Sequence, residues 1–197
     1  MKLFLSLLFL VSAAQAGVYK LDSDHSQVGF TVKHLMVTKV NGSFKKFEGS
    51  FDFDAAKKEL KEVNVAIDSD SIETGVADRD KHLKSDDFFN TKKFPKILFK
   101  SNKVEMAADG KSSKISGMLT MRDKTLPITL DVVNNGEVEF MGVKKVGFTA
   151  TGKLNRKDYG VAWNKSLDKG GVVVSDEVTI LIEGEANLDA AKAAAKK

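Results

Sequence analysis

The sequence contains no cysteine, which excludes disulfide bonds, thiolate metal sites, a cysteine nucleophile and a lipid-modified N-terminal cysteine. Proline is scarce, with 2 residues, and the aromatic residues are mostly phenylalanine: 13 Phe against 1 Trp and 2 Tyr. Because no covalent cross-link is available, an apolar core must hold the fold together. A chain of 197 residues suffices for one such domain, whereas two would be cramped.

The N-terminal segment has the three parts of an export signal. Met1-Lys2 forms a short positive region, LFLSLLFLV (Leu3–Val11) is apolar, and AQA (Ala14–Ala16) has the small-x-small pattern of a cleavage site. We therefore expect residues 1–16 to be a signal peptide and the protein to be periplasmic. No later apolar run is long enough to cross a bilayer, so we expect no stable membrane anchor.

The charged residues are spread over the whole chain. The formal net charge is +4, and lysine pairs alternate with acidic residues. This pattern is typical of a solvated surface, and we expect no nucleic-acid partner. A weak attraction to anionic lipid head groups stays open.

Apolar and polar residues alternate through most of the remaining sequence, with the period of half-buried strands. Eight such segments are joined mostly by turn residues such as Asp109-Gly110 and Asn134-Asn135-Gly136. The predicted strands are Ser26–His34, Phe47–Asp54, Glu62–Asp68, Lys96–Met106, Lys114–Met121, Leu126–Asn135, Lys145–Asn155 and Glu177–Leu188.

Eight antiparallel strands with one apolar face each predict an all-β domain, over residues 17–188, that is either a sandwich or a closed barrel. An eight-stranded barrel can be filled by side chains or can hold one elongated ligand. The alternation fails between Gly75 and Asn90, which predicts a short helical insert, with Ser85 as the cap of a second turn. The lysine- and alanine-rich tail, residues 189–197, has no apolar stripe.

The segment RDKHLKSDDFF (Arg79–Phe89) concentrates chemistry-bearing residues in this insert. In one interpretation, Arg79 or Asp80 makes a hydrogen-bonded ion pair that ties the insert to the barrel. In the other, Arg79, Asp80 and His82 form a polar rim for the head group of an amphiphile, while apolar neighbours guide its tail. The two interpretations are compatible.

Sites for catalysis or metal binding have no clear signature. His25, His34 and His82 lack the spacing of metal ligands, the Gly-x-Ser-x-Gly motif is absent, and Gly170-Gly171 does not join a strand to a helix. We therefore predict a protein that is not an enzyme and that uses no metal or cofactor.

Five long segments carry a resemblance to a known family. They are Leu21–His34, Gly42–Asp54, Asp68–Ser101, Ser116–Leu130 and Leu154–Asn164. In these segments, and in their order, the chain resembles the YceI-like family of exported lipid- or polyisoprenoid-binding proteins. The resemblance implies an extended lipocalin-like barrel, in which a hydrophobic tunnel holds a long isoprenoid or fatty chain and the insert covers part of the barrel.

Alternation selects the residues expected to face the interior, although it does not separate a tunnel wall from a packed core. The tunnel candidates are Val28, Phe30, Val32, Phe51, Phe53, Val65, Ile67, Ile97, Phe99, Leu119, Met121, Leu130, Phe148 and, at one end, Trp163. The rim and lid candidates are Arg79, Asp80, His82, Leu83, Phe88, Phe89 and Arg156.

The favoured hypothesis is a binding protein or carrier for a long-chain isoprenoid, such as a polyprenyl lipid or an isoprenoid quinone, or for a similar amphiphile. One alternative is an enzyme acting on such lipids, with His25, His82 and Arg79 as candidate groups. Another is a filled-core stress-response barrel with a protein partner. A homodimer stays open.

Overall fold

The computed structural model describes residues 16–54, 59–167 and 170–189. The predicted signal peptide lies outside the described residues except for Ala16, and the predicted tail does so except for Asp189. Within the described part, no helix is both long enough and apolar enough to cross a bilayer.

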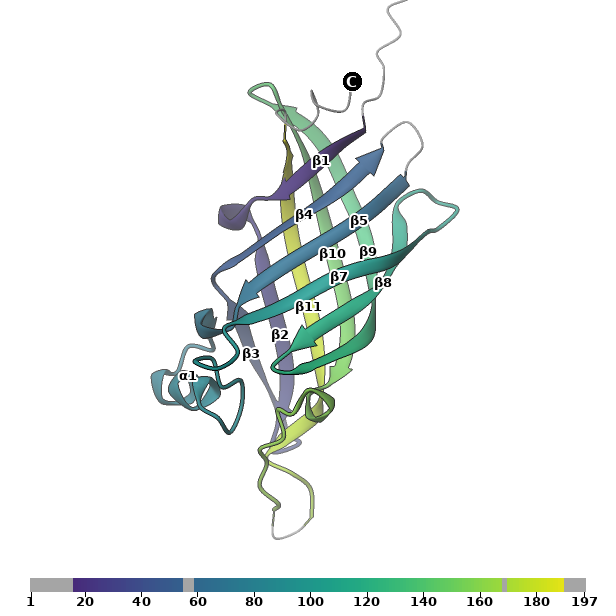
Figure 1. The fold of residues 1–197 in the computed structure, drawn as a ribbon. Coiled ribbons are helices and arrows are strands. Elements are labelled where there is room, and N and C mark those ends of the chain that lie inside the picture. Colours follow the sequence, from purple (N-terminus) through teal and green to yellow (C-terminus); the bar gives the residue numbers. More distant parts are fainter. Residues whose placement is uncertain (1–15, 55–58, 168–169, 190–197) are drawn as a thin grey trace, which may run out of the picture.

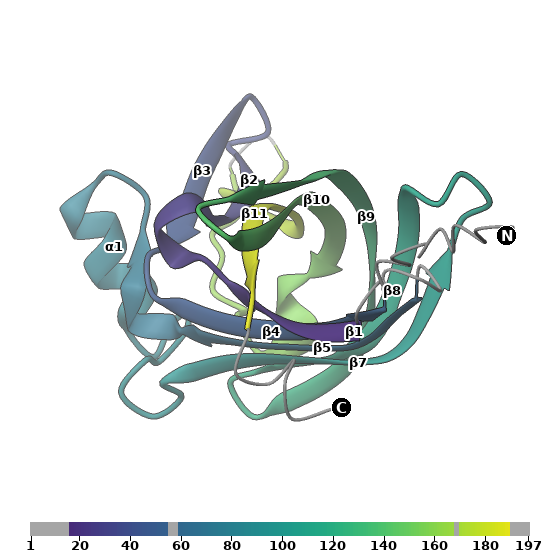
Figure 2. The same cartoon turned by 90° about the horizontal axis from the view of Figure 1, so that it is seen from above.

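A closed antiparallel barrel is formed by eight strands of the described chain, as predicted (Figures 1 and 2). Each strand pairs with the next, and the last pairs with the first through Tyr19 opposite Leu188. In ring order the strands are β1 (Ala16–Leu21), β4 (Phe47–Asp54), β5 (Glu59–Asp68), β7 (Lys96–Met106), β8 (Ser112–Met121), β9 (Lys124–Phe140), β10 (Val143–Asn155) and β11 (Val174–Leu188).

Three further strands extend the sheet from β11. The last residues of β11 pair with β1, and its earlier residues pair with β2 (Gln27–His34), because the 3₁₀ turn η1 (Ser23–His25) bends the chain between β1 and β2. β3 (Thr38–Phe44) pairs with β2, and the two-residue β6 (Ile72–Glu73) pairs with β3. The sequence analysis missed β1, β3 and β6. β1 adjoins the predicted signal peptide, β3 contains Asn-Gly, which is typical of a turn, and β6 is too short for alternation.

The predicted insert contains one α-helix, α1 (Ala77–Lys84), which lies outside the barrel near its lower end in Figure 1. The turn expected after Ser85 is present, because the Ser85 carbonyl accepts the N–H of Phe88 at 3.2 Å and that of Asn90 at 2.8 Å. The side chain of Ser85, however, belongs to the end of the preceding helix. Ser85 ends α1: its N–H and its hydroxyl both donate to the carbonyl of His82. Two short 3₁₀ turns, η2 (Ser69–Ser71) and η3 (Arg156–Tyr159), complete the helical elements of the described chain.

The apolar side chains gather in two clusters. The larger one follows the barrel interior and includes Ile97, Phe99, Ile115 and Leu119. The smaller one is centred on Tyr19, whose ring stacks on Phe51 at 5.3 Å between centroids, in the part of the barrel where β1 meets β11. The two clusters leave an unfilled space along the axis of the barrel.

Candidate binding cavity

The barrel encloses one large cavity of about 590 Å³. This volume is in the range of small-molecule binding sites. All fourteen tunnel candidates lie at its wall, and they come from β2, β4, β5, β7, β8, β9 and β10 and from the loop that carries Trp163. Whether each of them contacts a ligand stays a prediction.

The inward-facing side chains are incompletely covered, which distinguishes this interior from a filled core. Phe30, Val65, Leu130 and Val132 point into the barrel, yet each is only partly buried. A side chain inside a close-packed core would be covered by its neighbours. The exposed area of these residues therefore faces the cavity.

Several wall residues were not among the candidates. Val63, Val132, Ile180 and Ile182 line the cavity and are in phase with candidates on β5 and β9 or with residues on β2. One further step of alternation from Val65 and from Leu130 gives Val63 and Val132, whereas Ile180 and Ile182 belong to β11, from which no candidate had been chosen. His34, the last residue of β2, lines the cavity as well and is in phase with Val28 and Phe30.

Three rings in mutual contact line the lower end of the cavity. The His82 ring lies edge-on to Phe88 at 4.9 Å and to Trp163 at 5.1 Å, and Phe88 and Trp163 are 5.3 Å apart, all between centroids. His82 Nε2 also lies 2.8 Å from a carboxylate oxygen of Asp87. The insert and the loop before β11 therefore meet over the cavity through aromatic contacts.

Arg79 and Asp80 both bind Thr74, the residue after β6. Arg79 donates from Nε to the Thr74 hydroxyl at 2.7 Å and from Nη2 to the Thr74 carbonyl at 2.8 Å. The Asp80 carboxylate accepts the Thr74 N–H at 2.9 Å and its hydroxyl at 2.5 Å. Arg79 lines the cavity, as do His82, Leu83, Phe88 and Phe89. Asp80 is not among the residues that line the cavity, and its carboxylate is directed to Thr74 by these hydrogen bonds. Its role at a rim stays a prediction.

Arg156 is a buried cation that holds the loop carrying Trp163. Its side chain is 4% exposed and donates to the carbonyls of Ser175, Val161 and Trp163 at 2.6–2.9 Å and to that of Val174 at 3.2 Å. Burial lowers the pKa of Arg156, while the Asp176 carboxylate, 3.6 Å away, raises it. Arg156 lines the cavity but serves mainly to position its lower wall.

Arg122, in the β8–β9 turn, is a second arginine that holds segments together at the lower end of the barrel. Its Nη1 donates to the carbonyls of Phe88 and Gly160, both at 2.6 Å. One guanidinium thus links the insert to the turn that follows η3. Arg122 adopts a positive φ of 54°, which is uncommon for a residue other than glycine. The surrounding contacts hold its backbone in this conformation.

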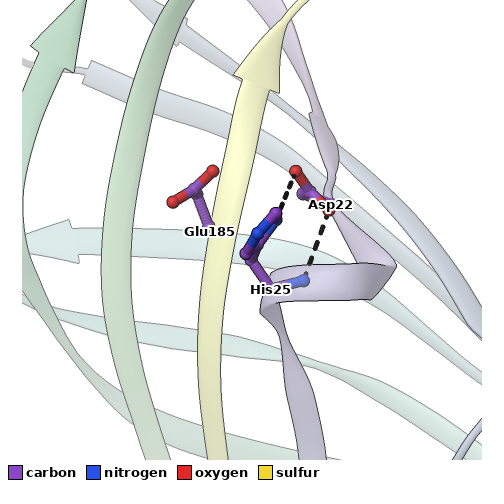
Figure 3. A group of neighbouring side chains, drawn as sticks. All are labelled: Asp22, His25 and Glu185. Atoms are coloured by element: carbon purple, nitrogen blue, oxygen red, sulfur yellow. Dashed lines mark hydrogen bonds and ion pairs between the residues drawn. The ribbon is translucent and has the colours of Figure 1, made fainter. Parts of the chain in front are cut away.

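A polar cluster lies where η1 approaches β11 (Figure 3). Asp22 accepts from the His25 ring at 3.1 Å, and Glu185 accepts from Lys145 at 2.6 Å. Asp22, His25 and Glu185 are donor types that could hold a metal, but the Lys145 ammonium already lies 3.8 Å from Asp22 and supplies the positive charge. We interpret the cluster as a structural fastening between η1 and β11.

Asp22 should make the stability of the protein depend on pH in the acid range. Burial raises the pKa of Asp22, but hydrogen bonds from His25, Asn187 and the Asp24 N–H outweigh it and lower this pKa to about 2. The ionised carboxylate therefore stabilises the fold above about pH 4, and this contribution is lost as the pH falls toward 2. Its size is of the order of 1 kcal/mol after solvent screening.

We expect Asp22→Asn to lower the free energy of unfolding at pH 7 and to reduce its further loss between pH 4 and pH 2. Urea unfolding across this range measures both effects. Asp24→Asn is the matched control, because Asp24 is an exposed carboxylate two residues further along the same turn. This substitution should leave the dependence of stability on pH unchanged. An unchanged profile in Asp22→Asn would contradict the assignment.

The chain is similar in sequence and in structure to known proteins. The sequence profile of the YceI-like domain matches residues 19–186.

The chain belongs to the YceI-like family. Protein YceI of Salmonella agona (strain SL483) is 38% identical over 184 residues, which cover 92% of this chain and 93% of that protein. The crystal structure of the Campylobacter jejuni YCEI protein has a TM-score of 0.69 and 36% identity, over 79% of this chain and 88% of that one.

A more distant solved structure shares the YceI-like fold. It is a polyisoprenoid binding domain from Saccharophagus degradans, with a TM-score of 0.61 and 15% identity, and it covers 87% of this chain and 98% of that one. The eight-stranded closed barrel of this chain therefore has the same fold as both solved structures.

Proposed function

We propose that this protein is an exported, non-enzymatic carrier, which binds one long-chain isoprenoid lipid or a similar amphiphile in its barrel. The observation that carries the proposal is the cavity of about 590 Å³, whose wall is almost wholly aliphatic and phenylalanine side chains. Such a wall recognises length and apolarity rather than a pattern of polar groups. The export signal predicted in residues 1–16 supports a periplasmic location.

The energetics favour a chain-like ligand. Burying each methylene is worth about 0.8 kcal/mol before ordering costs, so several isoprene units can give tight binding with few polar contacts. Two of the polar residues that line the cavity, His82 and Arg79, lie at its lower end. Arg79 uses Nε and Nη2 for Thr74 and has no partner for Nη1 among the described residues. That nitrogen is suited to an oxygen of a ligand head group.

Membership of the YceI-like family supports a binding role, because the Saccharophagus degradans domain with this fold is one that binds polyisoprenoid. The groups considered for an enzyme are not brought together. His25 pairs with Asp22 beside β11 and does not line the cavity, whereas His82 and Arg79 lie at its lower end. This separation favours binding over catalysis by those three residues.

Trp163 offers a direct test, since it is the single tryptophan of the chain and lines the cavity. We expect lipid-free protein titrated with geranylgeraniol to show a saturable change in Trp163 emission at one equivalent, together with a higher melting temperature. Glycerol and a short alcohol are the controls and should change neither. A signal that does not saturate, with an unchanged melting temperature, would contradict the proposal.

A further inference from the structure

Apolar side chains are exposed at the tip of the β2–β3 hairpin. Met36 is 55% exposed and Val37 is 85% exposed, and Leu35 beside them is also exposed. Three neighbouring apolar side chains exposed to water do not stabilise the fold, so their exposure calls for another explanation. Met36 is only partly sheltered, by the loop that contains Gly171.

The same turn has a backbone that these residues do not favour. Leu35 and Met36 both adopt positive φ angles, 51° and 63°. They are the two central residues of the β-turn His34–Val37, in which the Val37 N–H donates to the His34 carbonyl at 3.2 Å. Positive φ at both central positions favours Asn and Gly, because the Cβ of other residues lies too close to a carbonyl oxygen there. Two large apolar residues thus stand where Asn and Gly would give a more stable and more soluble turn, which points to a use for the apolar tip.

Positive charge surrounds this tip. Lys33 and Lys39 face each other across the hairpin, and Lys165 is on the adjacent loop. All three are exposed, and none makes an ion pair with another residue of the described chain. An apolar tip within a group of free lysines matches the chemistry of an anionic bilayer surface, where apolar side chains enter the interface and lysines contact head groups.

The tip adjoins the end of the cavity. Leu35 N–H donates to the carbonyl of Val173 at 2.9 Å, and both Val173 and His34 line the cavity. In Figure 1 the β2–β3 turn and the loop before β11 lie at the same end of the barrel, the end near which α1 lies. A bilayer that receives this tip would therefore lie against the polar end of the cavity.

We propose that the Leu35–Val37 turn, with Lys33, Lys39 and Lys165, is a docking element that inserts into the interface of an anionic lipid bilayer. Docking presents the lower end of the cavity to the membrane. The docking itself rests on the tip alone, and its use for lipid exchange rests on the proposed function.

The hairpin between β9 and β10 gives an internal control. Its tip also exposes apolar residues, Phe140 at 58% and Met141 at 87%, but the charges beside it are mixed, because Glu139 faces Lys144 across the hairpin. The strand register places it at the opposite end of the barrel, because it adjoins the end of β11 whereas His34 faces Val174 at the start. If exposed apolar residues alone bound membranes, both tips would act alike.

The experiment is flotation of the full mature protein with vesicles of phosphatidylglycerol and phosphatidylcholine, and with vesicles of phosphatidylcholine alone. We expect binding to the anionic vesicles, weakened by salt.

The double variant Leu35→Asn/Met36→Gly should bind at least about tenfold more weakly and should melt at a higher temperature, because it relieves the strained turn. Lys33→Gln and Lys39→Gln should each weaken anionic binding about fivefold. Phe140→Ser/Met141→Ser should bind like the wild type.

Vesicle binding that survives in Leu35→Asn/Met36→Gly would overturn the proposal, as would an equal loss in Phe140→Ser/Met141→Ser. If the wild type is a dimer in sedimentation analysis, the turn variant is a monomer and neither binds vesicles, the tip serves contact between copies instead.

Geranylgeraniol titration in the absence of vesicles separates the two proposals. The turn variant should keep normal ligand affinity, and loss of ligand binding in all proteins would refute the carrier function while leaving docking intact.

Discussion

Replacing Val132 by tryptophan is expected to abolish lipid binding while leaving the barrel folded. Val132 lies on β9 at the cavity wall and is only partly covered by its neighbours. A cavity of about 590 Å³ has room for an indole without the overpacking that disrupts a filled core. The added ring would occupy the space that the lipid chain needs, so we expect an affinity loss of at least about a hundredfold, measured by geranylgeraniol titration.

Val133 provides the matched control. It is the next residue of the same strand, its side chain points to the opposite face, and it is 46% exposed. Val133→Trp should bind lipid like the wild type. Equal effects of the two substitutions would show that the tryptophan disturbs the strand rather than fills the cavity. Normal binding in Val132→Trp would mean that lipid does not occupy the barrel interior.

Replacing Arg156 by methionine is expected to be the most destabilising single substitution. Arg156 donates to four carbonyl groups of the segments on both sides of the loop that carries Trp163. Methionine has a similar length but no donor, so those carbonyls lose their partners and Asp176 loses the buried one of its two cations. We expect a loss of about 3–5 kcal/mol in the free energy of unfolding, and a melting temperature lower by roughly 10 °C or more.

The neighbouring Lys157 tests whether charge alone explains the effect of Arg156. Lys157 also pairs with Asp176, at 2.9 Å, but on the surface of the protein. Lys157→Met should cost less than about 1 kcal/mol. Arg156→Lys should recover only part of the stability, because an ammonium group lacks the planar fork that reaches all four carbonyls. A loss below about 1 kcal/mol in Arg156→Met would contradict the positioning role.

Alternation predicted most of the strands because its signal is local, and the family resemblance favoured the barrel over the sandwich. Alternation along each strand reflects which face of the pleat is buried, and residues such as Phe30, Phe99 and Phe148 were placed at the interior on that basis alone. Alternation does not tell whether the interior is filled by side chains or contains a cavity. The answer depends on the width of the barrel, and this width follows from the closure of the ring by the pairing of β1 with β11.

The lower end was predicted less completely, because its contacts join segments far apart in the chain. Arg156 was expected at the rim, but its role as a donor to four carbonyls depends on how the fold brings residues 161–163 and 174–175 around it. Asp80 was placed on the rim by its neighbours in sequence, and hydrogen bonds direct its carboxylate to Thr74. Arg122 had no pattern around it, because its partners, Phe88 and Gly160, are brought near only by the fold.

The central claim is that the barrel holds one long lipid chain in its cavity. Its most direct test is native mass spectrometry of protein purified from a bacterial periplasm, with mass spectrometry of an organic extract of the same sample. We predict one bound isoprenoid or comparable long-chain amphiphile per protein, and none in Val132→Trp. A wild-type protein that is empty and takes up no added isoprenoid would contradict the claim.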